Sequence, residues 1–447
     1  METQEILLVG NGPVITQDDR QPLIEDGCVA IRNGVIDAVG STAELRQSYP
    51  QSKFLDARGR VIMPGLINTH THLYSAFARG LALKDASPGN FLQILERLWW
   101  RLDKVLTLED VYWSAMVGMI DCIRNGATTI FDHHASPNAV PGSLFRIADA
   151  AHQTGLRACL CYEVSDRDGA AIAAQGIEEN RAFLEHVKQS GTGQLRGLFG
   201  LHASFTLSDE TLSRCREVAG KLDAGFHVHT AEAASDVDAC LRDHGRRIVE
   251  RWRDAGILGS RTIAAHCVHV NDREIDLLRE SETNVVHNPE SNMGNAVGCA
   301  PVLEMMRRGV RVGLGTDGYT ADMFESLKVA SLLHKHQTGN PGAGWPEPPA
   351  MLFSGNAAIA SECFGRPVGK LIPGAHADII LVDYDPPTPL HAANVGGHIL
   401  FGFAGRSVST TIIGGRIVME GRQLLTIDEQ EIMIQARAFA AELWKRF

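Results

Sequence analysis

Two histidines separated by one residue, His70 and His72, could bind one metal ion together. On a β-strand, residues i and i+2 point to the same face, so both imidazoles can reach a single ion. An isolated pair of this kind could equally be two buried histidines bonded to backbone carbonyls. His229 and Asp317, which follow other apolar runs, complete a set of three imidazoles and one carboxylate. That set suits zinc or iron and leaves one coordination position for water.

A glutamate lies close to this set in the sequence, because Glu232 follows His229 by three residues. Beyond the end of a strand, a residue at that spacing can lie beside an activated water without ligating the ion. A general acid or base placed there can carry a proton to a leaving group. The alternative is a glutamate whose charge is favourable at the N-terminus of the next helix.

These polar residues are expected at the ends of short apolar runs, which helical stretches such as 109–124 and 209–222 separate. A histidine or an aspartate follows seven of the eight runs. Eight β/α units in series predict an α/β fold with a distorted (β/α)8 TIM barrel, whose active site lies at the carboxyl ends of the strands. An open doubly wound sheet is the alternative, but the sequence has no glycine-rich phosphate loop. The runs are residues 66–67, 128–131, 158–161, 197–201, 225–228, 262–265, 284–286 and 310–314.

The two ends of the chain predict strands joined by hairpins. Asn33-Gly34 and Gly414-Gly415 each lie between two apolar runs. Both turn positions of a two-residue hairpin need positive φ, which these residues tolerate. We therefore predict a composite β-sandwich domain of residues 1–63 plus 371–447, and a metal-dependent catalytic TIM barrel over residues 64–370.

The composition excludes several classes of protein. The 447 residues carry a formal charge of −11, which argues against nucleic acid or an anionic membrane as partner. No run approaches the roughly 18 apolar residues of a transmembrane helix, and the acidic start lacks the basic region of a signal peptide. The nine cysteines are mostly single, which favours a reduced, cytoplasmic protein.

The order of these motifs resembles the amidohydrolase superfamily, and in detail its branch of deaminases and triazine chlorohydrolases. The matching segments span most of the predicted barrel: residues 63–72, 200–203, 229–232, 265–267, 287–293 and 315–318. A narrower set of segments resembles the bacterial aminohydrolases called SsnA: residues 98–103, 132–137, 317–318 with 322–325, and 397–399.

The superfamily resemblance implies roles for six residues. His266 would polarise the attacking water, Asp317 would take its proton, and Glu232 would protonate the ring nitrogen before ammonia leaves. Binuclear members carry a modified lysine on strand four, whereas the run 195–203 here contains none. The resemblance therefore implies one divalent ion per chain, with zinc favoured over iron or manganese. Its ligands would be His70, His72, His229 and Asp317.

Four residues are candidate substrate contacts. His202 matches a family residue that touches substrate, although it could instead support a metal ligand. Asp103 lies near the place where several family deaminases carry a substrate-binding glutamate. Trp99 could stack on a flat heterocycle or pack in the core, and Arg79 could bind a carbonyl or carboxylate or remain at the surface. Three further histidines reach the predicted rim without a role, a second metal ion there being the less favoured alternative: His133, His134 and His287.

The predicted function is metal-dependent hydrolytic deamination of an aromatic N-heterocycle such as a purine or pterin. This makes the chain a hydrolase of non-peptide carbon–nitrogen bonds, with a small heterocycle as substrate and a homo-oligomer as the expected assembly. A triazine-type hydrolase with another leaving group is one alternative. A catalytically silent scaffold is the other, and it predicts gaps in the site that the sequence does not show.

Overall fold

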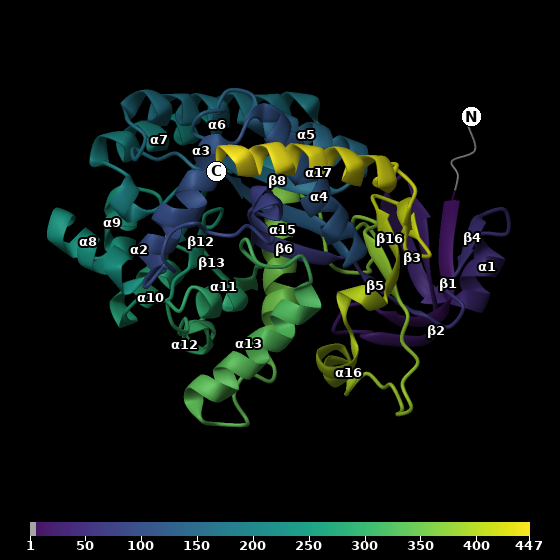
Figure 1. Cartoon of the computed structure of the whole chain (residues 1–447). Coiled ribbons are helices and arrows are strands. Elements are labelled where there is room, and N and C mark those ends of the chain that lie inside the picture. The colour runs from purple at the N-terminus through teal and green to yellow at the C-terminus, as the bar shows by residue number, and fades with distance from the viewer. Residues whose placement is uncertain (1–5) are drawn as a thin grey trace.

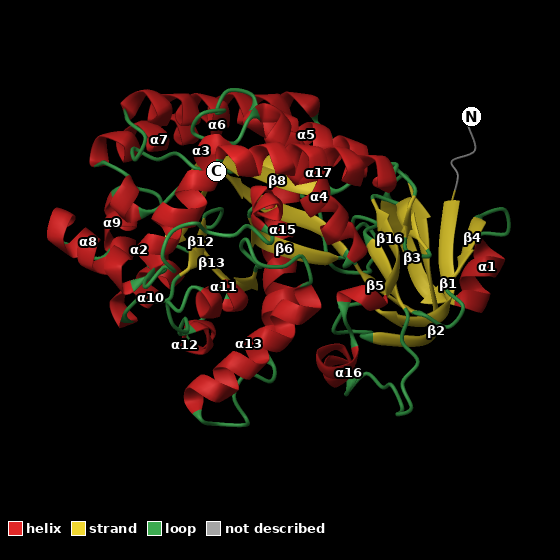
Figure 2. Ribbon diagram, in the orientation of Figure 1, coloured by secondary structure: helices red, strands yellow, loops and turns green. Residues whose placement is uncertain are grey.

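The computed structural model describes residues 6–447, which form a barrel and an adjoining β-sheet (Figure 1). The barrel strands lie among helices, whereas the sheet is more open (Figure 2). The buried ion pair of Arg157 and Asp378, 2.9 Å from Nε to Oδ2, ties the third barrel strand to the sheet side. The predicted α/β class is confirmed.

Eight parallel strand positions make the barrel, and each corresponds to one predicted apolar run. Their side chains are almost all buried, because a parallel sheet covered on both faces needs apolar residues on both. The fourth position is split in two at Leu198. The strands are β6 (Leu66–Thr71), β7 (Ala127–His134), β8 (Arg157–Tyr162), β9 (Leu195–Gly197), β10 (Phe199–Leu201), β11 (Phe226–Thr230), β12 (Ile263–His266), β13 (Asn284–His287) and β14 (Val312–Leu314).

The barrel is distorted, as predicted, because its strands form two sheets rather than one. One sheet runs from β6 to β9 and the other from β10 to β14. Isolated bridges cross the two junctions, Thr71 to Asp317 and Val164 to Leu201. At the first junction, the segment of His70 and His72 therefore lies beside the segment of Asp317.

Helices follow the barrel strands and cover them. Thr107 and Asp110 form a reciprocal capping box that starts α4, so this helix begins where the side chains can satisfy its free N–H groups. The predicted helices 109–124 and 209–222 are confirmed within a residue. The longer barrel helices are α4 (Leu108–Arg124), α5 (Ser143–Thr154), α6 (Ala170–Ser190), α7 (Asp209–Leu222), α8 (Ala234–His244), α9 (Ile248–Asp254), α10 (Asp272–Glu280), α13 (Met323–Thr338) and α15 (Asn356–Phe364).

Shorter helical segments complete the loops. Several lie at the carboxyl ends of the barrel strands, where they form pocket walls. They are η1 (Leu73–Ala78), α2 (Phe91–Ile94), η2 (Leu95–Trp99), α3 (Trp100–Val105), η3 (Ser204–Thr206), α11 (Pro289–Gly294), α12 (Val302–Arg307), α14 (Glu347–Pro349), η4 (Ala350–Gly355), α16 (Val395–Gly402) and η5 (Gly405–Ser407). Among the helices of residues 6–447, none has the length and apolar character needed to cross a membrane.

The adjoining sheet takes strands from both ends of the chain, which confirms the predicted β-rich unit built from both termini. Strands β5 and β15 pair antiparallel and join the two halves. The α1 helix (Thr42–Ser48) also belongs to the N-terminal half. The strands are β1 (Ile6–Ile15), β2 (Leu23–Arg32), β3 (Val35–Ser41), β4 (Lys53–Asp56), β5 (Val61–Pro64), β15 (Ile379–Val382), β16 (Val408–Ile413), β17 (Arg416–Glu420) and β18 (Gln423–Leu424).

Both predicted hairpins are confirmed. Asn33 and Gly34 have φ values of 52° and 76°, and Gly414 and Gly415 have 55° and 76°. This left-handed conformation at both turn positions suits the twist of the flanking strands. The C-terminal helix α17 (Glu429–Arg446) then returns to the barrel, where Glu429 pairs with Arg124 of α4 at 2.5 Å (Figure 1). The predicted domain boundaries at 63/64 and 370/371 stay predictions.

Candidate active site

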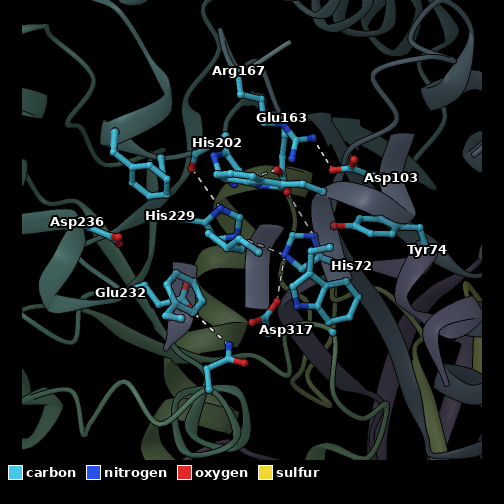
Figure 3. Close-up of a pocket in the computed structure, with 18 residues that line it drawn as sticks. His72, Tyr74, Asp103, Glu163, Arg167, His202, His229, Glu232, Asp236 and Asp317 are labelled. Atoms are coloured by element: carbon cyan, nitrogen blue, oxygen red, sulfur yellow. Dashed lines mark hydrogen bonds and ion pairs between the residues drawn. The ribbon is translucent and has the colours of Figure 1, made fainter. Parts of the chain in front are cut away.

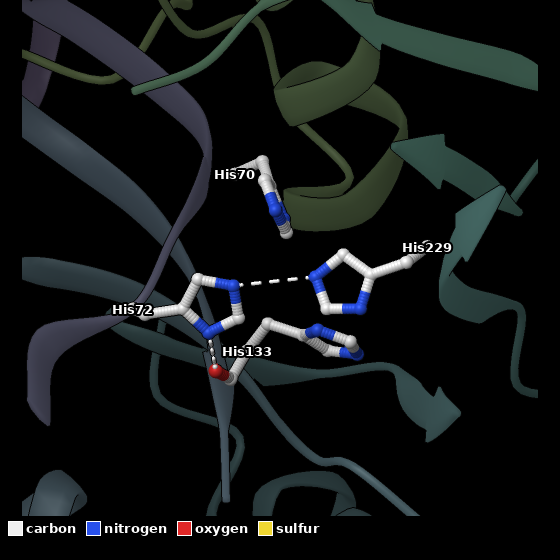
Figure 4. Close-up of side chains that lie close together, drawn as sticks. All are labelled: His70, His72, His133 and His229. Atoms are coloured by element: carbon white, nitrogen blue, oxygen red, sulfur yellow. Dashed lines mark hydrogen bonds between the residues drawn. The ribbon is translucent and has the colours of Figure 1, made fainter. Parts of the chain in front are cut away.

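The four predicted metal-binding residues converge at the carboxyl ends of the barrel strands. His70 and His72 come from β6, His229 from β11, and Asp317 follows β14. The Nε2 atom of His72 lies 3.3 Å from Nε2 of His229 and 3.0 Å from Oδ1 of Asp317. His70 Nε2 lies 3.7 Å from the same carboxylate oxygen. Figure 4 shows the three rings turned toward one another, with His133 beside them.

Hydrogen bonds to backbone carbonyls determine where the imidazole protons are. His72 Nδ1 contacts the carbonyl oxygen of His133 at 2.5 Å, and His229 Nδ1 contacts that of His202 at 3.1 Å. A carbonyl only accepts, so each Nδ1 carries the hydrogen and each Nε2 of a neutral ring presents a lone pair. Two lone pairs and a carboxylate oxygen then face one another. Such a donor set fits a divalent ion.

A buried residue behind this set, His227, was not predicted from the sequence. Nε2 of His227, in β11, lies 2.9 Å from Nδ1 of His70, and this contact orients the ring of His70. His70 Nε2 has no hydrogen-bond partner within residues 6–447, which leaves it free for an ion. The signal was in the sequence: His227 and His229 share the i, i+2 spacing of His70 and His72.

Glu232 and His266 lie on one side of the four residues. His266 Nε2 is 3.5 Å from Oε2 of Glu232 and 3.9 Å from Oδ2 of Asp317. Burial, reinforced by the charge of Asp317, raises the pKa of Glu232 well above its ordinary value, whereas a hydrogen bond from Asn295 lowers it. Glu232 is therefore suited to hold a proton near neutral pH.

The backbone at these strand ends is strained. His266 and Asp317 have φ values of 73° and 53°, although neither is a glycine. Residues other than glycine rarely adopt this left-handed backbone region, and those that do are concentrated at functional sites. His266 is also held through Nδ1, which donates to Oδ1 of Asn292 at 2.9 Å.

A pocket opens in front of these residues, and three of the four predicted substrate contacts line it: His202, Trp99 and Asp103 (Figure 3). Asp103 is buried and forms an ion pair with Arg167, a pocket residue that the sequence analysis did not single out. Burial raises the pKa of Asp103 to about 7, with Arg167 opposing that shift. Trp100 and Tyr74 add aromatic surface to the walls.

Arg79 does not reach this pocket. Its side chain is 67% exposed and its guanidinium lies 2.8 Å from the carboxylate of Asp121. Two of the rim histidines without an assigned role, His134 and His287, contact residues outside the proposed metal-binding set. His134 Nε2 contacts Ser136 Oγ at 2.9 Å, and the ring of His287 lies 5.1 Å from that of His334.

Glu163 is a further residue of the site that was not predicted from the sequence. It follows β8, the one predicted strand to which we assigned no histidine or aspartate. It is buried in the pocket wall, and its carboxylate faces His72, His133 and His202. A single glutamate beyond an apolar run carries little signal on its own, but its position at a strand end of a predicted barrel could have indicated it.

The fold and the four converging residues define a metal-dependent hydrolase of barrel type. The sequence profile described as "Amidohydrolase family" matches residues 61–418, and the chain belongs to this family. A second profile, an imidazolonepropionase-like composite domain of bacteria, matches residues 27–51. Family membership and the His-rich cluster support the predicted divalent metal.

Among curated proteins, the chain is similar to deaminases over nearly its whole length. It is 33% identical over 444 residues to the 5'-deoxyadenosine deaminase of Methanosarcina mazei, covering 98% of this chain and 99% of that protein. The values are the same for the 5-methylthioadenosine/S-adenosylhomocysteine deaminase of Pelotomaculum thermopropionicum. The prediction of a hydrolase acting on non-peptide carbon–nitrogen bonds is confirmed.

Solved structures share the fold. An adenosine deaminase of Xanthomonas campestris with bound zinc has a TM-score of 0.85 at 25% identity, over 98% of both chains. The atrazine chlorohydrolase TrzN of Arthrobacter aurescens has a TM-score of 0.81 at 22% identity, over 97% of this chain and 100% of that one. The second likeness shows the fold alone.

Proposed function

We propose that this chain is a metal-dependent hydrolytic deaminase of an aminopurine, with adenosine-derived nucleosides as the first candidate substrates. One observation carries the proposal. The Nε2 atoms of His72 and His229 lie 3.3 Å apart beside the Asp317 carboxylate, and the same pocket holds Glu232, whose pKa burial raises well above its ordinary value. A hydrolytic deaminase needs both parts together.

The proposed metal site consists of His70, His72, His229 and Asp317. When bound, a divalent ion supplies water whose pKa lies near neutrality. Nitrogen donors and one carboxylate favour zinc, with iron or manganese as alternatives. The zinc in the adenosine deaminase of Xanthomonas campestris supports this choice.

The chain's own residues then carry the protons. Asp317 accepts the proton of the attacking water at its carboxylate, and Ser291 Oγ, 2.5 Å from Oδ2, keeps that group oriented. Glu232 donates the proton of its carboxyl group to the ring nitrogen. Asp317 passes the proton it took from water to the amine, which leaves as ammonia, and the new hydroxyl group returns a proton to Glu232 as the oxo product forms. His266, held by Asn292, hydrogen-bonds the water through Nε2.

The proposed substrate contacts are His202, Asp103 and Trp99. An aromatic wall of Trp99 and Trp100 suits a flat purine, and the polar end of the pocket at Asp103 and Arg167 suits a hydroxyl-bearing group. The names of the relatives, which include 5'-deoxyadenosine and S-adenosylhomocysteine deaminases, support a nucleoside. The role first predicted for Arg79 has no support from its position at the surface.

Ammonia release from the metal-loaded protein tests this proposal. The panel is adenosine, 5'-deoxyadenosine, 5-methylthioadenosine, S-adenosylhomocysteine, guanine, a pterin, cytosine and a chlorotriazine. We expect ammonia and the matching 6-oxo product from at least one adenosine derivative. Release of chloride from the triazine without any deamination would instead favour the triazine-type alternative.

The two alternatives fit the site less well. A chloride leaves without a proton whereas an amine needs one, so the two proton-carrying carboxyl groups, Asp317 and Glu232, suit an amine better. A silent scaffold predicts losses from the catalytic set, but the residues of that set lie together. Three other expectations stay proposals: domains of residues 1–63 plus 371–447 and of residues 64–370, a homo-oligomer, and a cytoplasmic location.

A further inference from the structure

Two cysteines that are distant in sequence place their sulfur atoms next to each other. Cys159 lies in β8 and Cys363 lies near the end of α15, and both are free thiols. The Sγ atom of Cys363 is 3.6 Å from that of Cys159. An S–S bond is about 2.0 Å long, so a side-chain rotation that brings the two sulfurs about 1.6 Å closer allows a bond to form.

Packing inside the barrel holds the two thiols in this position. Ala360 and Phe364 of α15 belong to one buried apolar cluster with Phe131 of β7 and Cys159 of β8, and Cys363 packs against the same cluster. The cluster also takes residues from β6, β12 and β13, so it fills the space between the strands. Because such an interior is close-packed, the two sulfurs stay neighbours in the folded chain.

The neighbouring cysteine of the same strand makes a different contact. Cys161 shares a strand face with Cys159, since the two are separated by one residue. Its Sγ atom, however, donates to the backbone carbonyl of Asp132 at 3.6 Å. The sulfur that contacts Cys159 belongs to Cys363.

A cavity of about 350 Å³ gives small molecules access to one of the two thiols. Cys363 lines this cavity together with residues at the amino-terminal ends of barrel strands, among them Ile263 and Asn284. Cys363 is partly exposed, whereas Cys159 is only 2% exposed. A small oxidant that enters the cavity therefore meets Cys363 first, at the opposite end of the barrel from the candidate active site.

A positive charge beside this pair favours thiolate, which is the form of cysteine that reacts. Arg196 lines the same cavity, and its guanidinium lies 5.6 Å from the centre of the Phe364 ring, next to Cys363. It donates to backbone carbonyls and has no carboxylate partner within residues 6–447. Burial raises the pKa of the Cys159 thiol well above its ordinary value, with Arg196 opposing that shift, so the first attack falls to Cys363.

We propose that Cys159 and Cys363 are an oxidation site, where hydrogen peroxide converts the two thiols to a reversible disulfide. The Cys363 thiolate attacks one peroxide oxygen, the O–O bond breaks, and Cys363 becomes a sulfenic acid while the other oxygen leaves as water. The Cys159 sulfur then attacks the Cys363 sulfur. The S–S bond forms as the S–O bond breaks, and the hydroxyl group leaves as water with the proton of the Cys159 thiol.

The electrons balance, because the two sulfurs together lose two electrons and the peroxide gains them. A dithiol reductant restores both thiols. The bond joins β8 to α15 across 204 positions of the chain. Closing so long a loop restricts the unfolded chain, so the oxidised protein should be more stable to heat than the reduced protein.

Peptide mapping of the full chain tests the proposal. The reduced protein is treated with a small molar excess of hydrogen peroxide, its remaining thiols are alkylated in denaturant, and it is digested without reductant. We expect mass spectrometry to detect a linked pair of peptides that contain Cys159 and Cys363, and dithiothreitol to abolish it. The oxidised chain should melt roughly 5 °C above the reduced chain.

Two serine variants are the matched controls. Cys363→Ser should give neither the linked peptides nor the rise in melting temperature. Cys299→Ser makes the same change at the other partly exposed cysteine, and it should keep both. Linked peptides without any rise in melting temperature would overturn the stabilising role of the bond.

The wild-type map decides the proposal even if a variant fails to fold. Recovery of Cys363 as a sulfinic or sulfonic acid without a link to Cys159 would overturn it, and so would a link between Cys159 and Cys161. None of these outcomes depends on the proposed deamination, which ammonia release tests separately.

Discussion

The side chain of Asn295 donates a hydrogen bond to Oε1 of Glu232 at 3.3 Å. The same amide donates to Oγ of Ser291 at 3.2 Å, and Ser291 donates to Oδ2 of Asp317 at 2.5 Å. A short chain of hydrogen bonds therefore connects the two carboxyl groups to which we assign proton transfer. Its middle members belong to α11 and the residue after it, so this segment orients both groups at once.

Replacing Asn295 by alanine should change the pH dependence of the reaction. Glu232 must be protonated to act as an acid, so kcat/KM falls as pH rises through its pKa. Because the bond from Asn295 lowers that pKa, its loss should move the alkaline limb to higher pH. A pH profile measures the shift. Asn394→Ala, at an exposed helix cap, should leave the limb in place.

Replacing Glu232 by glutamine should remove the acid and keep the metal. We expect kcat to fall by about 10²–10⁴-fold, the usual contribution of a positioned general acid. Ammonia release gives the rate, and metal analysis checks that the ligands still bind. A variant that releases ammonia at the wild-type rate would contradict the mechanism.

Removing the metal should lower the stability of the protein. An ion that binds only the folded chain stabilises it, and the Nε2 atoms of His72 and His229 come within 3.3 Å of each other only in the folded chain. We expect a chelator to lower the melting temperature of the wild type, and added zinc to restore it. The chelator should have a smaller effect on His229→Asn. Equal drops in both proteins would argue against His229 as a ligand.

The pair of Asp103 and Arg167 should matter for stability as well as for substrate. The Asp103 side chain is buried, at 2% exposure, and that of Arg167 is 11% exposed, so Arg167→Met leaves the Asp103 carboxyl group without its partner. We expect a loss of about 3–5 kcal/mol in the free energy of unfolding, measured by urea denaturation. The double variant with Asp103→Leu should recover part of that loss. Arg79→Met, at an exposed pair, should change stability by less than about 1 kcal/mol and leave kcat/KM unchanged.

Local patterns in the sequence were sufficient to predict the barrel and the convergence of the four proposed metal ligands. The i, i+2 spacing of His70 and His72, the eight apolar runs and the two hairpin turns depend on neighbouring residues alone, and the structure shows the elements they predict. The parallel strands of a barrel bring their carboxyl ends to one rim. His229 and Asp317 could therefore be predicted as metal ligands although they are distant in sequence from His70 and His72.

Only the tertiary structure decided which side chains face each other across that rim. It paired Asp103 with Arg167, placed Glu163 between His133 and His202, connected Asn295 to Glu232, and left Arg79 at the surface. These contacts join loops distant in sequence, so no spacing encodes them. Periodicity reports which face a residue takes on its own strand or helix, whereas loop packing and the sharing of protons among buried groups depend on the whole fold.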